Sequence, residues 1–239
     1  NKRIDFLHYC GDLIIMSGLL FISGGLFTAI TIGLFQLIGF NIEDFYFENV
    51  VVWGLPSIPL IASYLIFNNK DLVSKISPII AKIFTPFVFL ILSIFSFAII
   101  FSDKNILVDR ELLLMFNIII IAVLALILFS LSHINNSNKF QFILLFSLSI
   151  ISIIDNLIVL FAISSRLFEF GITPNRLVLT GLNLLASFHL VIISKQLLLL
   201  ILKKVNTNNI LNSIVRYLPI YVIWTAIVVF LFPIIFNFK

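Results

Sequence analysis

Two adjacent polar residues, Asp155 and Asn156, interrupt a long apolar run in the second half of the chain. An aspartate near the middle of a membrane costs roughly 2.5–3.5 kcal/mol on insertion scales, so we expect it to face other helices instead of lipid. Two interpretations of this carboxyl group stay open. It is either a proton or cation relay, or an interhelical hydrogen-bond anchor that forms a polar clasp with Asn156.

A polar stripe follows on the next apolar segment. At about 100° per residue, one face of a helix there collects several polar side chains, namely Arg176, Thr180, Asn183, Ser187 and Ser194. The stripe predicts helix packing through hydrogen bonds, and the alternative is one wall of a hydrated path with Arg166 and Arg176 at its mouth. His189 lies on nearly the opposite face and is expected to be a hydrogen-bonded core residue. The predicted intramembrane polar site comprises Asp155, Asn156, Thr180, Asn183 and Ser187.

The segment between these two apolar runs predicts a tight helical hairpin. Residues 166–176 read Arg-Leu-Phe-Glu-Phe-Gly-Ile-Thr-Pro-Asn-Arg. Gly171 is typical of a residue that ends a helix in a left-handed conformation. Thr173 followed by Pro174 is typical of an N-cap and the first residue of the next helix.

The charges of this hairpin predict an anion site. Arg176 falls in the first turn of the second helix, where the helix dipole disfavours a cation, so we expect negative charge beside it. Glu169 is one candidate, and a phosphate of a lipid or solute is another. Arg166 and Glu169, three residues apart, can also pair directly. The candidate anion- or lipid-binding residues are therefore Arg166, Glu169 and Arg176.

Long helices are needed to position these side chains. A bilayer core about 30 Å thick is crossed by roughly 20 apolar residues in a helix. The sequence predicts seven such spans: Leu13–Ile38, Val50–Phe67, Pro78–Phe101, Leu112–Leu131, Phe140–Phe161, Leu177–Leu202 and Val215–Phe236. The runs are continuously apolar, without the alternation of barrel strands. The predicted fold is all-α, a polytopic membrane bundle of about seven transmembrane helices.

Composition agrees with a chain dissolved in lipid. Hydrophobic residues make up 61% and charged residues 11% of the sequence, whereas soluble domains carry about 25% charged residues. The hinges are too short for a soluble domain, so residues 1–239 are predicted to form a single membrane domain. The chain starts at Asn1 and enters its first span almost at once, so we expect it to be part of a longer protein. A lone Cys10 excludes an internal disulfide and a cysteine metal cage.

The basic residues are dispersed among the hinges, which predicts membrane lipids and not nucleic acid as partners. On the side of the membrane where the N-terminus is predicted to lie, the basic residues are Lys2, Arg3, Lys70, Lys75, Lys139, Lys203 and Lys204. The opposite side carries Lys104, Arg110, Arg166, Arg176 and Lys239. The positive-inside rule then predicts a cytoplasmic N-terminus.

The hairpin sequence at residues 166–176 resembles the signature of the bacterial "domain of unknown function 4153" membrane family. Further matching stretches are Asn49–Pro56, the Ser77-Pro78 and Thr85-Pro86 pair, and Asp109-Arg110-Glu111. Family members are usually longer than this chain. The resemblance implies a multi-pass protein of the bacterial inner membrane, and it supplies no activity.

The common enzyme motifs are absent from the sequence. There is no His-Glu-x-x-His pair, no Gly-x-Ser-x-Gly elbow and no P-loop. No catalytic residue, metal site or cofactor is therefore predicted, and an enzyme is not the favoured class.

Three function classes remain open. The leading one is a transport-related, permease-like subunit for a small or anionic solute, with Asp155 as the coupling acid. The alternative is a non-catalytic accessory or scaffold subunit of a larger membrane complex with protein partners, since Gly25, Ala29 and Gly33 form a small-residue ridge on the first span. A lipid-handling enzyme whose arginines hold a lipid phosphate ranks third.

Overall fold

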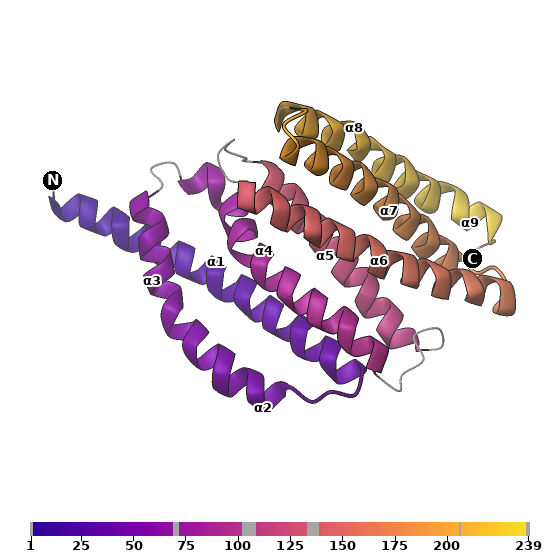
Figure 1. Cartoon of the computed structure of the whole chain (residues 1–239), viewed down its shortest axis with the longest axis horizontal. Helices are drawn as coiled ribbons and strands as arrows, with labels where there is room; N and C mark the ends of the chain where they lie inside the picture. Colours follow the sequence, from indigo (N-terminus) through magenta and orange to yellow (C-terminus); the bar gives the residue numbers. More distant parts are fainter. Residues whose placement is uncertain (1, 69–71, 102–108, 133–138, 206, 238–239) are drawn as a thin grey trace. The chain divides into compact units, whose positions relative to one another are not determined.

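The computed structural model describes residues 2–68, 72–101, 109–132, 139–205 and 207–237, and within these ranges it contains helices and no strand (Figure 1). Lys70, Lys104 and Lys239, which entered the charge count by side, lie outside the described residues. The helical elements are α1 (Lys2–Leu37), α2 (Glu43–Tyr46), η1 (Phe47–Val51), α3 (Val52–Asn68), α4 (Leu72–Ala98), η2 (Ile99–Phe101), α5 (Arg110–Ser132), α6 (Lys139–Phe170), α7 (Pro174–Ile201), α8 (Thr207–Ala226), η3 (Ile227–Leu231) and α9 (Phe232–Ile235).

Seven helical segments among the described residues are long and apolar enough to cross a membrane. They are Tyr9–Leu37, Glu43–Asn68, Ser77–Ala98, Glu111–Ser132, Lys139–Phe170, Pro174–Ile201 and Ile210–Ile235. The prediction of an all-α fold with seven apolar helices is confirmed, and the chain is a multi-pass membrane protein.

The largest differences from the predicted spans are at the start of the second and the end of the fifth. The second begins at Glu43 and not at Val50, because α2, η1 and α3 follow one another without a break. The fifth reaches Phe170 and not Phe161. The expectation of roughly 20 residues per span reflects the thickness of the bilayer and does not locate the end of a helix. Here the helix ends before Gly171, whose φ of 79° is left-handed.

The chain divides into two compact units, residues Asn1–Ile80 and Ala81–Lys239. In the first unit α1 packs against α3. The Tyr9 hydroxyl lies 2.8 Å from Ser63 Oγ, and the Tyr9 and Phe67 rings are 5.4 Å apart. Whether residues 1–239 form a single membrane domain stays a prediction.

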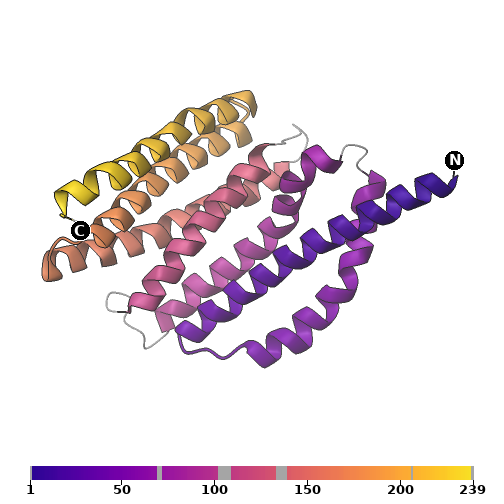
Figure 2. The same ribbon diagram turned by 180° about the vertical axis from the view of Figure 1, so that it is seen from behind.

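The second unit contains the last part of α4 and the helices α5 to α9. Helices α6, α7 and α8 lie side by side, and α5 packs against α6 and α7 (Figures 1 and 2). Its fully buried side chains include Phe95, Phe116, Ile120, Leu145, Leu190 and Ile193. Large apolar side chains also cover outer faces, among them Leu157 and Phe188, as expected of a surface solvated by lipid.

The order of these helices decides where the polar residues meet. Helices α5 and α6 are antiparallel neighbours, and α6 and α7 form a hairpin. The first turns of α5, the last turns of α6 and the first turns of α7 therefore lie at the same end of the second unit.

Candidate functional site

The hairpin between α6 and α7 has the predicted geometry. α6 ends at Phe170, and Gly171 adopts the left-handed conformation that glycine favours. Thr173 is the N-cap of α7, its hydroxyl oxygen accepting from the Arg176 amide at 3.4 Å, and Pro174 is the first helical residue. The predicted helix stop, cap and start are confirmed.

Arg176 meets the backbone of α6 and not an acidic side chain. Its Nη1 donates to the carbonyl oxygens of Phe170 at 3.1 Å and Gly171 at 2.8 Å, and its guanidinium carbon lies 5.7 Å from the centroid of the Phe170 ring. The C-terminal end of a helix is electronegative and its last carbonyls lack helical partners. The end of α6 therefore offsets the unfavourable position of the cation at the start of α7.

Glu169 does not take the role that the sequence suggested for it. Its side chain is exposed. Among the described residues no ion pair links Glu169 to Arg166 or Arg176, and the α6 carbonyls occupy the place of the expected carboxylate.

Replacing Arg176 with glutamine tests this contribution to stability. We expect Arg176→Gln to lower the free energy of unfolding by about 1 kcal/mol, because two charge-assisted bonds at a half-exposed site are lost. The melting temperature in detergent falls by about 2–4 °C. Asn175→Ala is the matched control, since the exposed Asn175 side chain bonds to no described residue. Equal losses in both variants would contradict the capping role.

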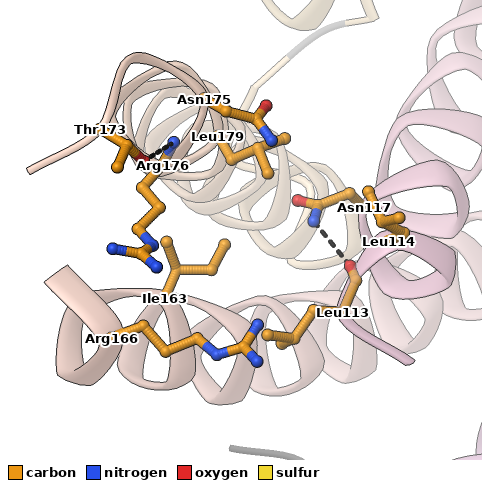
Figure 3. Close-up of a pocket in the computed structure, with 9 residues that line it drawn as sticks. All are labelled: Leu113, Leu114, Asn117, Ile163, Arg166, Thr173, Asn175, Arg176 and Leu179. Carbon is orange, nitrogen blue, oxygen red and sulfur yellow. Dashed lines mark hydrogen bonds between the residues drawn. The ribbon is translucent and has the colours of Figure 1, made fainter. Parts of the chain in front are cut away.

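A cavity of about 290 Å³ opens between the first turns of α5, the last turns of α6 and the first turns of α7. Its lining residues, which define the arginine pocket, are Leu113, Leu114, Asn117, Ile163, Arg166, Thr173, Asn175, Arg176 and Leu179. Arg166 extends along α6 toward Leu113, and Arg176 extends from α7 toward α6 (Figure 3). Two of the described lining residues, Arg166 and Arg176, are basic and none is acidic.

A buried chain of amides begins at the wall of this pocket. Asn117, 4% exposed, donates to the Leu113 carbonyl at 2.6 Å and accepts at Oδ1 from Asn183 Nδ2. Asn156, fully buried, donates to the Asn183 carbonyl and to Ser187 Oγ, each at 2.9 Å. These bonds join α5, α6 and α7 through Asn156 and without Asp155, which the sequence had paired with it.

Asn117 was not among the predicted site residues. It is a single asparagine in the apolar run Leu112–Leu131. A lone amide inside a membrane span is the signal that finds it, because a buried polar group there requires a partner.

Asp155 lies apart from the amide chain. Successive residues of a helix point about 100° apart, so Asp155 faces α4 while Asn156 faces α7. The carboxyl group, 2% exposed, accepts from Ser96 Oγ at 2.9 and 3.0 Å. Ser96 shares its hydroxyl with the Leu92 carbonyl at 2.7 Å.

The predicted intramembrane site is therefore only partly assembled. Asn156, Asn183 and Ser187 lie together, and Asp155 bonds to a different helix. Thr180 donates to the Arg176 carbonyl of its own helix at 2.8 Å and takes no part in the clasp.

The opposite face of α7 packs on α8 through aromatic residues. His189 is fully buried, stacks on Tyr217 with ring centroids 4.4 Å apart, and has Nδ1 3.3 Å from the Tyr221 hydroxyl. Tyr217 donates to the Leu185 carbonyl at 2.9 Å. The prediction of a hydrogen-bonded core histidine is confirmed.

Within the described ranges no group of three or more His, Cys, Asp or Glu side chains could hold a metal ion. Comparisons with protein-family models, with curated proteins and with solved structures found no match to this chain. The geometry defines a multi-pass membrane protein with a pocket lined by two arginines at one end of its second unit.

Proposed function

We propose that this multi-pass protein is a transport-related, permease-like subunit of the bacterial inner membrane that takes a small anionic solute into the arginine pocket. The observation that carries the proposal is the junction at Asn117. This residue lines the pocket and is also the first member of the buried amide chain.

The pocket is suited to attract an anion. Arg166 and Arg176 line it together, and no described acidic side chain joins them. Clustered charge of one sign next to low-dielectric walls raises the local concentration of an oppositely charged solute. The walls here include Leu114, Ile163 and Leu179, so the arginines act where water screens them less than on an open surface.

The buried polar residues next to the pocket favour a transport function over binding alone. Asn117, Asn183 and Asn156 place amide groups in a region where polar side chains are costly and usually functional. Asp155 directly precedes Asn156 on α6, lies at the same depth and bonds to Ser96 of α4. In the proposal it is the coupling acid, because a carboxyl group inside the membrane can take up and release a proton.

The expected orientation assigns a direction to the proposal. A cytoplasmic N-terminus places the hairpin of α6 and α7 on the external side, so the pocket receives solute from outside. The resemblance to the "domain of unknown function 4153" family supports the bacterial inner membrane as the location and adds no solute.

A second candidate, an accessory subunit of a larger complex, is favoured by one observation on α1. Gly25 belongs to the small-residue ridge, and within the first unit no described atom lies within 4 Å of a Cβ built on it. Such a flat face lets another helix approach closely. A partner that copurifies in fixed stoichiometry and is lost on Gly25→Leu supports this candidate.

Anion-driven currents from proteoliposomes on a solid-supported membrane test the transport proposal. The probes are concentration jumps of inorganic phosphate, glycerol 3-phosphate and lactate. We expect a current with at least one probe, and we expect Asp155→Asn to reduce it at least tenfold, because an amide cannot exchange a proton. The asparagine oxygen still accepts from Ser96, so folding is retained.

Arg216→Gln is the control for this experiment, since Arg216 is exposed on α8 and does not line the pocket. Its current is expected to equal that of the wild type. Currents no larger than those of empty liposomes with all three probes contradict the proposal. An undiminished current in Asp155→Asn removes the role of that residue as coupling acid.

A further inference from the structure

We infer that the arginine pocket binds a phosphate ester, the chemistry shared by an anionic lipid headgroup and a small soluble organophosphate. The inference rests on the proposed function, because it names the ligand class for the same pocket. Three features of the pocket point to this ligand: the hydrogen-bond donors that line it, its two arginines, and the apolar side chains of its wall and rim.

Arg176 keeps most of its donors for a ligand. Only Nη1 has partners among the described residues, the carbonyls of Phe170 and Gly171. These two bonds hold the guanidinium plane in place, while Nη2 and Nε remain as a two-donor edge. Such an edge matches two oxygens of one phosphate or carboxylate group, which is why arginine recognises both in bidentate fashion.

Further donors lie on the same wall. The Thr173 hydroxyl oxygen accepts from the Arg176 amide, and its own proton has no acceptor among the described residues. The Asn175 amide lines the pocket from the neighbouring position. Donors that outnumber acceptors in this way select an anion over a cation.

The charge of the wall favours phosphate over carboxylate. Two arginines from different helices line one cavity. A carboxylate has two oxygens and one charge, whereas a phosphate ester offers more oxygens and, as a monoester, up to about two charges. Asp109, which precedes α5, does not line the pocket, and its Oδ1 accepts from the Glu111 and Leu112 amides at 3.0 and 3.2 Å.

The apolar lining residues favour a ligand that carries an apolar portion next to its phosphate. Leu113, Leu114, Ile163 and Leu179 form that part of the wall. A volume of about 290 Å³ is at the lower limit of small-molecule pockets. It accommodates a headgroup with its first carbons and not a complete two-chain lipid.

The rim of the pocket indicates where such a ligand comes from. Phe168, Phe170 and Ile172 of the hairpin are exposed, Phe168 by 90%. An exposed apolar turn at the end of two transmembrane helices belongs in the interfacial layer of the bilayer. The pocket beside it is therefore at the depth of lipid phosphates, although a soluble phosphate ester reaches the same depth from water.

Binding measurements on the purified chain in a neutral detergent test the inference. The probes are dihexanoyl phosphatidylglycerol for the lipid, glycerol 3-phosphate for the soluble ester and hexanoate for a carboxylate. We expect at least one phosphate ester to bind at least tenfold more tightly than hexanoate. Tight binding of phosphatidylglycerol alone identifies a lipid, and comparable binding of glycerol 3-phosphate identifies a soluble ester.

Variants separate the pocket from the rest of the surface. We expect Arg166→Gln and Arg176→Lys each to weaken phosphate-ester binding at least tenfold, the second because lysine keeps the charge and loses the two-donor edge. Arg216→Gln is expected to bind like the wild type, and melting temperatures verify that each variant is folded.

Three results would overturn the inference: no binding of either phosphate ester, equal binding of hexanoate, or unchanged binding in folded Arg166→Gln and Arg176→Lys. The outcome is distinguishable from that of the transport proposal. Phosphate-ester binding without anion-driven current keeps this inference and removes transport. Current driven by lactate without phosphate-ester binding does the reverse.

Discussion

Asn183→Leu is expected to lower the free energy of unfolding by about 1–2 kcal/mol, although leucine has nearly the same size as asparagine. The substitution removes the Nδ2 donor that bonds to Asn117 Oδ1. Asn117 is 4% exposed, so its oxygen then stays buried without this partner, and an unsatisfied buried polar group costs about 1–3 kcal/mol. Interhelical hydrogen bonds measured in membranes contribute at most about 1.7 kcal/mol. The loss expected for Asn183→Leu is therefore below the upper end of that range.

Reversible unfolding in mixed micelles, followed by circular dichroism, measures this loss. Thr180→Val is the matched control on the same helix, because among the described residues the Thr180 hydroxyl bonds only to the carbonyl of Arg176 one turn earlier. We expect the control to change the free energy of unfolding by less than about 0.5 kcal/mol.

A double-mutant cycle with Asn117→Leu separates the bond from general effects of the substitutions. When both asparagines are replaced, neither is left with an unpaired partner, so we expect the double variant to lose less than the sum of the single losses. Fully additive losses, or a control as destabilising as Asn183→Leu, would contradict the clasp between α5 and α7.

The fold was predictable because a membrane span needs only length and hydrophobicity. Every predicted span overlaps one of the seven apolar helical segments among the described residues of the structure. The helix stop at Gly171 and the cap at Thr173 are local features that follow from residue type. The end of α6 was missed by several residues, since hydropathy alone does not distinguish the membrane boundary from the helix terminus.

The site was predictable only in part, because its partners come from different helices. The sequence identified Asn156, Asn183 and Ser187 but not Asn117, whose role depends on how α5 docks against α7. It joined Asp155 to this group, although the two faces of α6 meet different neighbours.

The environment of Arg176 shows a further limit of sequence-based prediction. A compensating negative charge was expected from Glu169 or a ligand phosphate. The structure supplies it from the carbonyls of Phe170 and Gly171. Backbone carbonyls are present at every residue, so no sequence pattern distinguishes those that will bind a cation.

Gly181→Leu is expected to destabilise the packing of α7 on α8 by about 1–3 kcal/mol. A Cβ at Gly181 would overlap the Cζ2, Cη2 and Cε2 atoms of Trp224, which lies directly over this glycine. Small residues in membrane helices permit such close approach. Adding a side chain to a filled interface forces neighbours away or into poor rotamers, which typically costs about 1–3 kcal/mol. The loss appears as a lower melting temperature in detergent.

The contact itself, and not a general intolerance of this chain to larger residues, is tested by two further variants. Gly18→Leu on α1 is the matched control, because no described atom lies within 4 Å of a Cβ built there, and we expect it to be close to neutral. Trp224→Leu removes the indole and is expected to restore most of the stability that Gly181→Leu loses. If Gly181→Leu were as harmless as Gly18→Leu, or the loss persisted without the indole, Gly181 would not set the distance between α7 and α8. A rescue by Trp224→Leu is the expected result. It would show that position 181 requires glycine because the Trp224 indole fills the space that a side chain there would need.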